Sequence, residues 1–127
     1  MSCVPNALVL ESPAVAAAAD QWFQHRVGSR TDVRRLSPDE NIRPGLPPTI
    51  IVEGRTDTVT PLAGVQRFAE RMRAAGNRCD LHVFDGAGHL ITPAGTPDNG
   101  IPQPDPAIEA AAFARFDSFL RELGYCN

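Results

Sequence analysis

The sequence predicts an α/β fold of about three parallel strands with flanking helices, and three observations support it. Residues 49–53 form a short β-branched run between Pro48 and Gly54, as expected of a buried parallel strand. Apolar residues then recur at helical spacing over 62–75, and residues 79–84 form a second strand pattern. A strand, a helix and a strand in this order make a right-handed crossover, which places the two strands in parallel.

The remaining segments complete this sheet and its cover. Residues 6–11 are expected to form a third strand. Asp105 can cap a helix that begins at Pro106 and carries an apolar stripe to Leu123, and Thr60 is a plausible N-cap for the first helix. The other segments are expected to be short helical turns (14–19 and 20–27) or irregular connections (28–47 and 90–105).

Length, charge and cysteine content limit the class of protein. The 127 residues have room for one domain, 1–127, and the net charge of −3 gives no footprint for nucleic acid or an acidic membrane. No apolar run approaches the roughly 20 residues that span a bilayer, and no signal-peptide pattern is visible. Cys3, Cys79 and Cys126 show neither disulfide nor zinc spacing, so we expect a cytoplasmic protein without metal or cofactor.

Two residues with catalytic potential follow neighbouring predicted strands. Asp57 comes just after strand 49–53, and His89 comes just after strand 79–84. The carboxyl ends of parallel strands meet at one edge of the sheet, where ligands bind. A histidine that moves protons needs an acceptor on its second nitrogen, and a carboxylate at the next strand tip can serve. The alternative is that Asp57 only caps a turn and His89 is a loop histidine.

The surrounding motifs resemble a known family. GRTDTVTP followed by GAGH is similar to the C-terminal half of α/β-hydrolase-fold esterases and lipases, in the dienelactone-hydrolase and prolyl-oligopeptidase-like branch. NALVLESPAV, LSPDENIRPGLPPTIIVEG and FDSFLRELGY extend the likeness over nearly the whole chain. The resemblance implies a partial α/β-hydrolase fold and hydrolysis of a small-molecule carboxylic ester. It also implies that Asp57 is the acid and His89 the base of a catalytic triad.

The third member of such a triad is missing from the sequence. No G-x-S-x-G occurs, and the family order of serine, acid and histidine would put the nucleophile upstream of Met1. We therefore expect the back half of an enzyme, inactive or weakly active alone. The five serines of the chain lack the strand-turn-helix elbow, and Ser12, at a strand end, is the least poor candidate among them: Ser2, Ser12, Ser29, Ser37 and Ser118.

Other charged residues suggest weaker hypotheses. His82, Asp85 and His89 could form a metal site, but His82 belongs to a strand and is expected to lie on its face. Glu53 and Asp85 are interpreted as ordinary strand-end carboxylates.

Self-association is a second functional prediction. The strand at residues 6–11 has no partner on its outer side, and an uncovered parallel edge invites pairing with another chain. We expect a homo-oligomer formed through this edge. The alternative function is accordingly a non-catalytic module, self-associating or ligand-binding, derived from the hydrolase fold.

Overall fold

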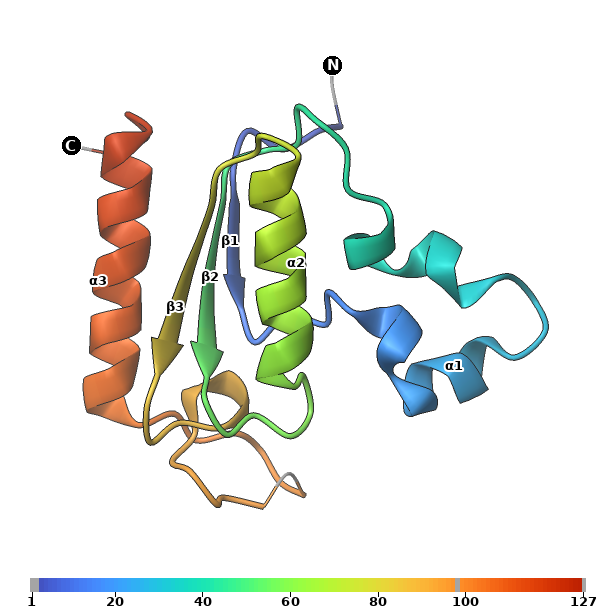
Figure 1. Cartoon of the computed structure of the whole chain (residues 1–127). Helices are drawn as coiled ribbons and strands as arrows, with labels where there is room; N and C mark the ends of the chain where they lie inside the picture. Colours follow the sequence, from blue (N-terminus) through green and yellow to red (C-terminus); the bar gives the residue numbers. More distant parts are fainter. Residues whose placement is uncertain (1–2, 98, 127) are drawn as a thin grey trace.

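A computed structural model describes residues 3–97 and 99–126 of the chain. Three parallel strands form one sheet in the order β1-β2-β3, which confirms the predicted α/β class (Figure 1). The strands are β1 (Leu8–Glu11), β2 (Thr49–Gly54) and β3 (Cys79–Phe84), and the helices are α1 (Gln21–Val27), α2 (Leu62–Ala74) and α3 (Pro106–Glu122). The first strand is two residues shorter than the predicted segment 6–11.

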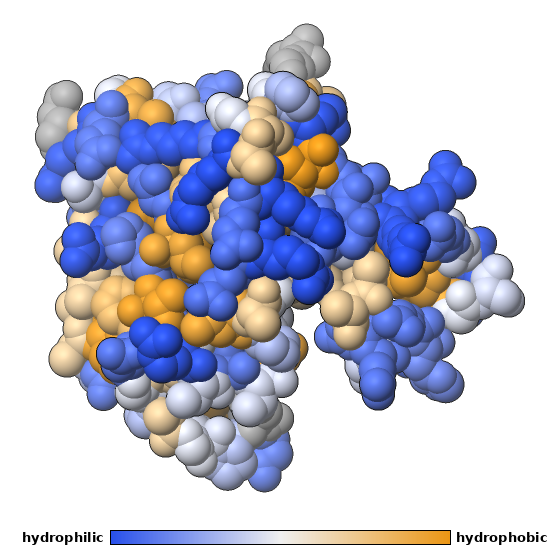
Figure 2. All heavy atoms as spheres, in the orientation of Figure 1, coloured by the Kyte–Doolittle hydropathy of each residue, from blue (hydrophilic) through white to orange (hydrophobic). Residues whose placement is uncertain are grey.

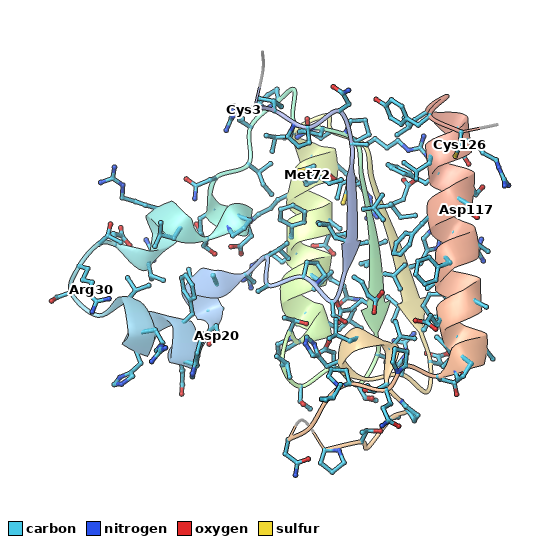
Figure 3. The ribbon with its side chains drawn as sticks, turned by 180° about the vertical axis from the view of Figure 1, so that it is seen from behind. Cys3, Asp20, Arg30, Met72, Asp117 and Cys126 are labelled. Atoms are coloured by element: carbon cyan, nitrogen blue, oxygen red, sulfur yellow. The ribbon has the colours of Figure 1, made fainter. Side chains whose placement is uncertain are left out.

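Helices α2 and α3 cover opposite faces of the sheet (Figure 1). Ile51 faces the α2 layer and its neighbours Ile50 and Val52 face the α3 layer, because successive strand residues point to opposite sides. Met72 of α2 lies between its helix and the sheet (Figure 3). All six residues of β2 are buried, which explains the nearly continuous apolar run that predicted this strand.

The helix caps agree only partly with the prediction. The side chain of Asp105 accepts hydrogen bonds from the amides of Ala107 and Ile108, so α3 begins as predicted. The prediction that Thr60 caps α2 was wrong, because Pro61 is the N-cap residue and offers no side-chain bond. The Thr60 amide and hydroxyl both donate to Asp57 instead, so Thr60 belongs to the turn of the acid.

Between β1 and β2 the chain leaves the sheet and forms an arm, residues 13–48, which projects to one side of the molecule (Figures 1 and 2). It contains α1 and three single 3₁₀ turns. Asp39 fixes the arm to α2: its buried carboxylate accepts two hydrogen bonds from Arg67, at 2.9 and 3.0 Å, and one from the Ser37 hydroxyl at 2.5 Å. This buried acid therefore helps to dock the arm on α2, together with the ion pair of Glu40 with Arg71 and the apolar packing of Val15.

The three cysteines form no disulfide with one another within the described part of the chain. Cys3 and Cys126 are exposed at separate places (Figure 3), Cys79 is buried, and all three are free thiols. Among residues 3–97 and 99–126, no helix combines the length and apolarity that crossing a bilayer requires.

Candidate active site

The turn after β2 fixes the carboxylate of Asp57. The amides of Val59 and Thr60 donate to Oδ1 at 2.8 and 2.7 Å, and the Thr60 hydroxyl donates to Oδ2 at 2.9 Å. The carboxylate is fully buried. An aspartate whose oxygens accept amides two and three residues ahead closes its own turn, so the sequence Asp57 to Thr60 sets the direction of this side chain.

The turn after β3 carries His89 in an unusual backbone conformation. Leu90 and the buried Ile91 have φ values of 49° and 57°, a region that non-glycine residues, and β-branched ones above all, seldom adopt. The turn is held from two sides: the Leu90 amide donates to the Ser12 hydroxyl at 3.0 Å, and the Asp105 amide donates to the Ile91 carbonyl at 2.9 Å. Strained backbone that persists under such restraint is a feature of functional sites.

The acid turn and the histidine turn are packed backbone to backbone. Both the amide and the hydroxyl of Thr56 donate to the Ala87 carbonyl, each at 3.0 Å. A Cβ atom on Gly54 would come within 2.2 Å of the Gly88 carbonyl oxygen. Glycine at position 54 is therefore what lets the two turns approach each other.

This packing brings together the two residues that the sequence analysis proposed. His89 Nδ1 lies 2.9 Å from Asp57 Oδ2, and the Thr60 hydroxyl lies 3.4 Å from the same nitrogen. The imidazole is partly exposed, at 21%, while the carboxylate beneath it is not. One ring nitrogen thus faces a buried acid, which leaves Nε2 for a reacting group.

The electrostatics favour a charged Asp57. Burial by itself would raise the pKa of Asp57, but the neighbouring Glu53 together with the Thr60 amide, His89 and the Thr60 hydroxyl holds it below the usual value. Asp57 is therefore a carboxylate at neutral pH. In that state it can orient the imidazole of His89 and stabilise the imidazolium that forms when the ring accepts a proton.

Glu53, predicted to be an ordinary strand-end carboxylate, is a buried residue and was misjudged. Its side chain is completely inaccessible, and burial raises its pKa to about 9. The signal for this was the period of two in β2: Glu53 follows Ile51 on the same face of a fully buried strand. The roles of Thr60 and Ser12 were also missed: Thr60, which donates to Asp57, was predicted to be a helix cap, and the partner of Ser12, Leu90, lies 78 residues away.

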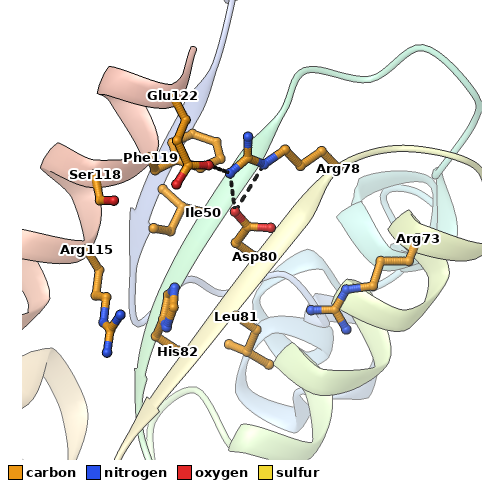
Figure 4. A pocket seen from close by; sticks show the side chains of 10 residues that line it. All are labelled: Ile50, Arg73, Arg78, Asp80, Leu81, His82, Arg115, Ser118, Phe119 and Glu122. Atoms are coloured by element: carbon orange, nitrogen blue, oxygen red, sulfur yellow. Dashed lines mark hydrogen bonds and ion pairs between the residues drawn. The ribbon is translucent and has the colours of Figure 1, made fainter. Parts of the chain in front are cut away.

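His82, Asp85 and His89, the weaker alternative considered for a metal site, do not form a set of metal ligands in the described structure. Within the described ranges, no group of three His, Cys, Asp or Glu side chains is placed to hold a metal ion. Asp85 forms an exposed ion pair with Arg55. His82 instead lines a separate cavity of about 390 Å³ between β3 and α3, where Arg78 pairs with Asp80 and Glu122 (Figure 4).

The serines of the described part have other partners or lie elsewhere. The Ser12 hydroxyl accepts a hydrogen bond from the Leu90 amide, and the Ser37 hydroxyl donates one to Asp39. Ser29 lies in the arm, and Ser118 lines the cavity shown in Figure 4. None of these four hydroxyls hydrogen-bonds to His89, whose described partners are Asp57 and Thr60. Ser2 lies outside the described residues.

A larger cavity of about 800 Å³ borders the acid turn. It lies between the arm and the start of α2, and its wall includes Thr60 and Val59 from the acid turn and Trp22 from α1. Trp22 is 68% exposed. The hollow between the arm and the body is visible in Figure 2. Its size and apolar lining are typical of a small-molecule site.

Comparison with known proteins gives consistent relatives. The pattern of the prolyl oligopeptidase family matches residues 14–115. A Methylorubrum extorquens protein named "Putative carboxymethylenebutenolidase" is 32% identical over 80 residues, which are 63% of this chain and 27% of that protein.

Solved structures of Thermogutta terrifontis esterase 2 share the fold. The apo form superposes with a TM-score of 0.76 at 33% identity, over 96% of this chain and 44% of that one. The propionate-bound form superposes with a TM-score of 0.73 at 34% identity, over 94% and 43%. The chain thus spans less than half the length of these relatives. It belongs to the prolyl oligopeptidase family, and its three-stranded sheet is part of an α/β-hydrolase esterase fold.

Proposed function

We propose that this chain carries the acid and the base of a serine carboxylic-ester hydrolase, Asp57 and His89, and that the nucleophile is a serine in a G-x-S-x-G turn outside these 127 residues. The observation that carries the proposal is the 2.9 Å contact between His89 Nδ1 and the buried Asp57 Oδ2. The esterase relatives support the reaction class.

In the first half of the reaction, the serine oxygen attacks the ester carbonyl while its proton moves to His89 Nε2. Asp57 accepts the hydrogen bond from Nδ1 and stabilises the imidazolium. The intermediate then collapses: the bond between the carbonyl carbon and the alcohol oxygen breaks, and His89 returns the proton to the leaving alcohol. An acyl-serine remains.

In the second half, water replaces the alcohol. His89 takes a proton from the water as its oxygen attacks the acyl carbon, and returns it to the serine oxygen as the acid departs. The cavity beside Thr60 and Val59 would hold the apolar part of a small ester, because it adjoins the acid turn and is lined largely by apolar side chains.

The test combines this chain with a nucleophile-bearing N-terminal half, either encoded by a longer reading frame or added as a separate polypeptide. Hydrolysis of p-nitrophenyl acetate is expected to appear on reconstitution and to fall by roughly 10³–10⁴-fold in His89→Ala. His25→Ala, which removes an exposed histidine of α1, is the matched control and should leave the rate unchanged. Equal rates for His89→Ala and the unsubstituted chain would contradict the proposal.

A second candidate is the non-catalytic, self-associating module. It is favoured by β1, which has no strand on its outer side among the described residues and whose Val9 is 40% exposed. Light scattering after size exclusion is then expected to show a defined homo-oligomer, and Val9→Lys to give a monomer. Covalent labelling of a serine in the chain alone by a fluorophosphonate would exclude this candidate.

A further inference from the structure

Glu53 is a buried acid with no ordinary partner. It is the last residue but one of the central strand β2, and its side chain has no access to solvent. Neither carboxylate oxygen accepts a hydrogen bond of good geometry in the described structure. A buried charge without donors costs far more free energy than a buried neutral group, so this position is unsuited to an ionised glutamate.

The acid next to Glu53 is in the opposite situation. Asp57 accepts hydrogen bonds from the amides of Val59 and Thr60 and from the Thr60 hydroxyl, and it faces His89. Two carboxylates cannot hydrogen-bond to each other unless one carries a proton. When two adjacent carboxyl groups share one proton, the group with fewer donors keeps it. Here that group is Glu53.

The charges around the pair point the same way. Burial is the largest cause that raises the pKa of Glu53 to about 9, and the interaction with Asp57, the charge of Asp57 and that of Glu11 on β1 contribute to the same rise. The nearby Gly54 amide favours the charged form, but it is outweighed. On the other side of the pair, His89 and Thr60 lower the pKa of Asp57.

We propose that Glu53 is a positioning residue that keeps its proton and donates it to Asp57 as a hydrogen bond. Asp57 is then held from below by Glu53, at its turn by the Val59 and Thr60 amides, and above by His89. The donor keeps Asp57 ionised and stationary, so that His89 keeps its Nδ1 proton directed at the acid. The catalytic value of this arrangement depends on the proposed function, but the position of the proton does not.

Carboxyl-carbon NMR of the 127-residue chain tests the location of the proton directly. The Glu53 signal is expected to titrate near pH 9, far above the ordinary value of 4.5. The Asp57 signal is expected to titrate below its ordinary value of 3.8. Titration of Glu53 near 4.5 would overturn the proposal. This readout needs no substitution and no hydrolytic activity, so a failure of the proposed function leaves it intact.

Substitutions test the positioning role. Glu53→Gln keeps a donor of the same shape, whereas Glu53→Leu removes it. The Nδ1 proton resonance of His89, observed on ¹⁵N-labelled protein, is expected to survive in Glu53→Gln and to broaden or vanish in Glu53→Leu. Glu70→Gln, on the exposed side of α2, is the control and should match the unsubstituted chain.

An unchanged resonance in Glu53→Leu, or its loss in Glu53→Gln, would show that Glu53 does not position Asp57. Should Glu53→Leu fail to fold, Glu53→Gln and the titration still decide the matter. In the reconstituted enzyme, kcat is expected to fall in Glu53→Leu and to stay close to that of the unsubstituted enzyme in Glu53→Gln. KM is expected to be unchanged in both variants.

Discussion

The Ser12 hydroxyl accepts a hydrogen bond from the Leu90 amide at 3.0 Å, which joins the end of β1 to the turn that carries His89. Ser12 is buried and has a φ of 44°. Its partner in the hydrogen bond, Leu90, has a φ of 49°. Two strained residues thus meet through one hydrogen bond. The edge strand of the sheet therefore supports the histidine as well as the fold.

Replacing Ser12 with alanine tests this support. Ser12→Ala leaves the partly buried Leu90 amide without its acceptor, and we expect a loss of about 1–2 kcal/mol in the free energy of unfolding, measured with urea. Ser118→Ala, on the exposed face of α3, should change stability by less than about 0.5 kcal/mol. A loss of the same size in both variants would show that the hydroxyl of Ser12 has no special role.

The contact between the acid turn and the histidine turn predicts a stronger effect at Gly54. Gly54→Ala places a methyl group 2.2 Å from the Gly88 carbonyl oxygen, which must move. We expect a destabilisation of about 3 kcal/mol or more in urea unfolding. Gly100→Ala is the control, because nothing lies within 4 Å of a Cβ atom there. Equal stability of the two variants would mean that the turns can separate freely.

Local patterns were sufficient to predict the sheet and the pair of candidate residues. The β-branched run of β2, the cap at Asp105 and the motifs around Asp57 and His89 each depend on residues close in sequence. The parallel direction of the strands was predicted from the alternation of strands and helical segments and the right-handed crossover rule. The sequence therefore contained enough local information to place an acid and a histidine at one sheet edge.

The support of the site was not predictable in the same way. The bond between Ser12 and Leu90, and the shared proton of Glu53 and Asp57, arise only when the sheet is assembled. Thr60 is an example: its sequence context suits a helix cap, where its hydroxyl would accept a hydrogen bond from an amide, but in the structure the hydroxyl donates to the Asp57 carboxylate. The partner of Ser12, 78 residues away, leaves no periodic signal in a single sequence.

The docking of the arm gives a third prediction. Asp39→Ala removes the group that accepts hydrogen bonds from Arg67 and from the buried Ser37 hydroxyl. We therefore expect the free energy of unfolding, measured with urea, to fall by about 2 kcal/mol. This is less than the full cost of breaking a buried ion pair, because Arg67 remains in contact with water. Glu40→Ala, the neighbouring exposed acid, should cost under about 1 kcal/mol.

Proteolysis distinguishes a local effect from a global one. If Asp39 docks the arm, Asp39→Ala should expose residues 28–36 to trypsin at their arginines while α2 and the sheet stay protected. Unchanged cleavage in Asp39→Ala would contradict the assigned role of the buried acid.

The raised pKa of Glu53 predicts the pH dependence of stability. The unfolded chain releases the Glu53 proton near pH 4.5, and the folded chain keeps it until about pH 9. Between these values the folded state binds one more proton than the unfolded state. The contribution of Glu53 to stability is therefore fully present below pH 4.5 and decreases as pH rises, by up to about 1.4 kcal/mol per pH unit.

Glu53→Gln removes this dependence, because glutamine does not titrate. The difference in unfolding free energy between Glu53→Gln and the unsubstituted chain should therefore shift in favour of the variant from pH 5 to pH 8, when measured with urea at each pH. Asp57, whose pKa is lowered, acts in the opposite direction, but only near and below pH 3.8, outside this range. The unfolding free energy of the control Glu70→Gln should change with pH in the same way as that of the unsubstituted chain. If the unfolding free energy of Glu53→Gln also changed with pH in that way, Glu53 would be ionised in the folded state, and the proton would not lie between Glu53 and Asp57.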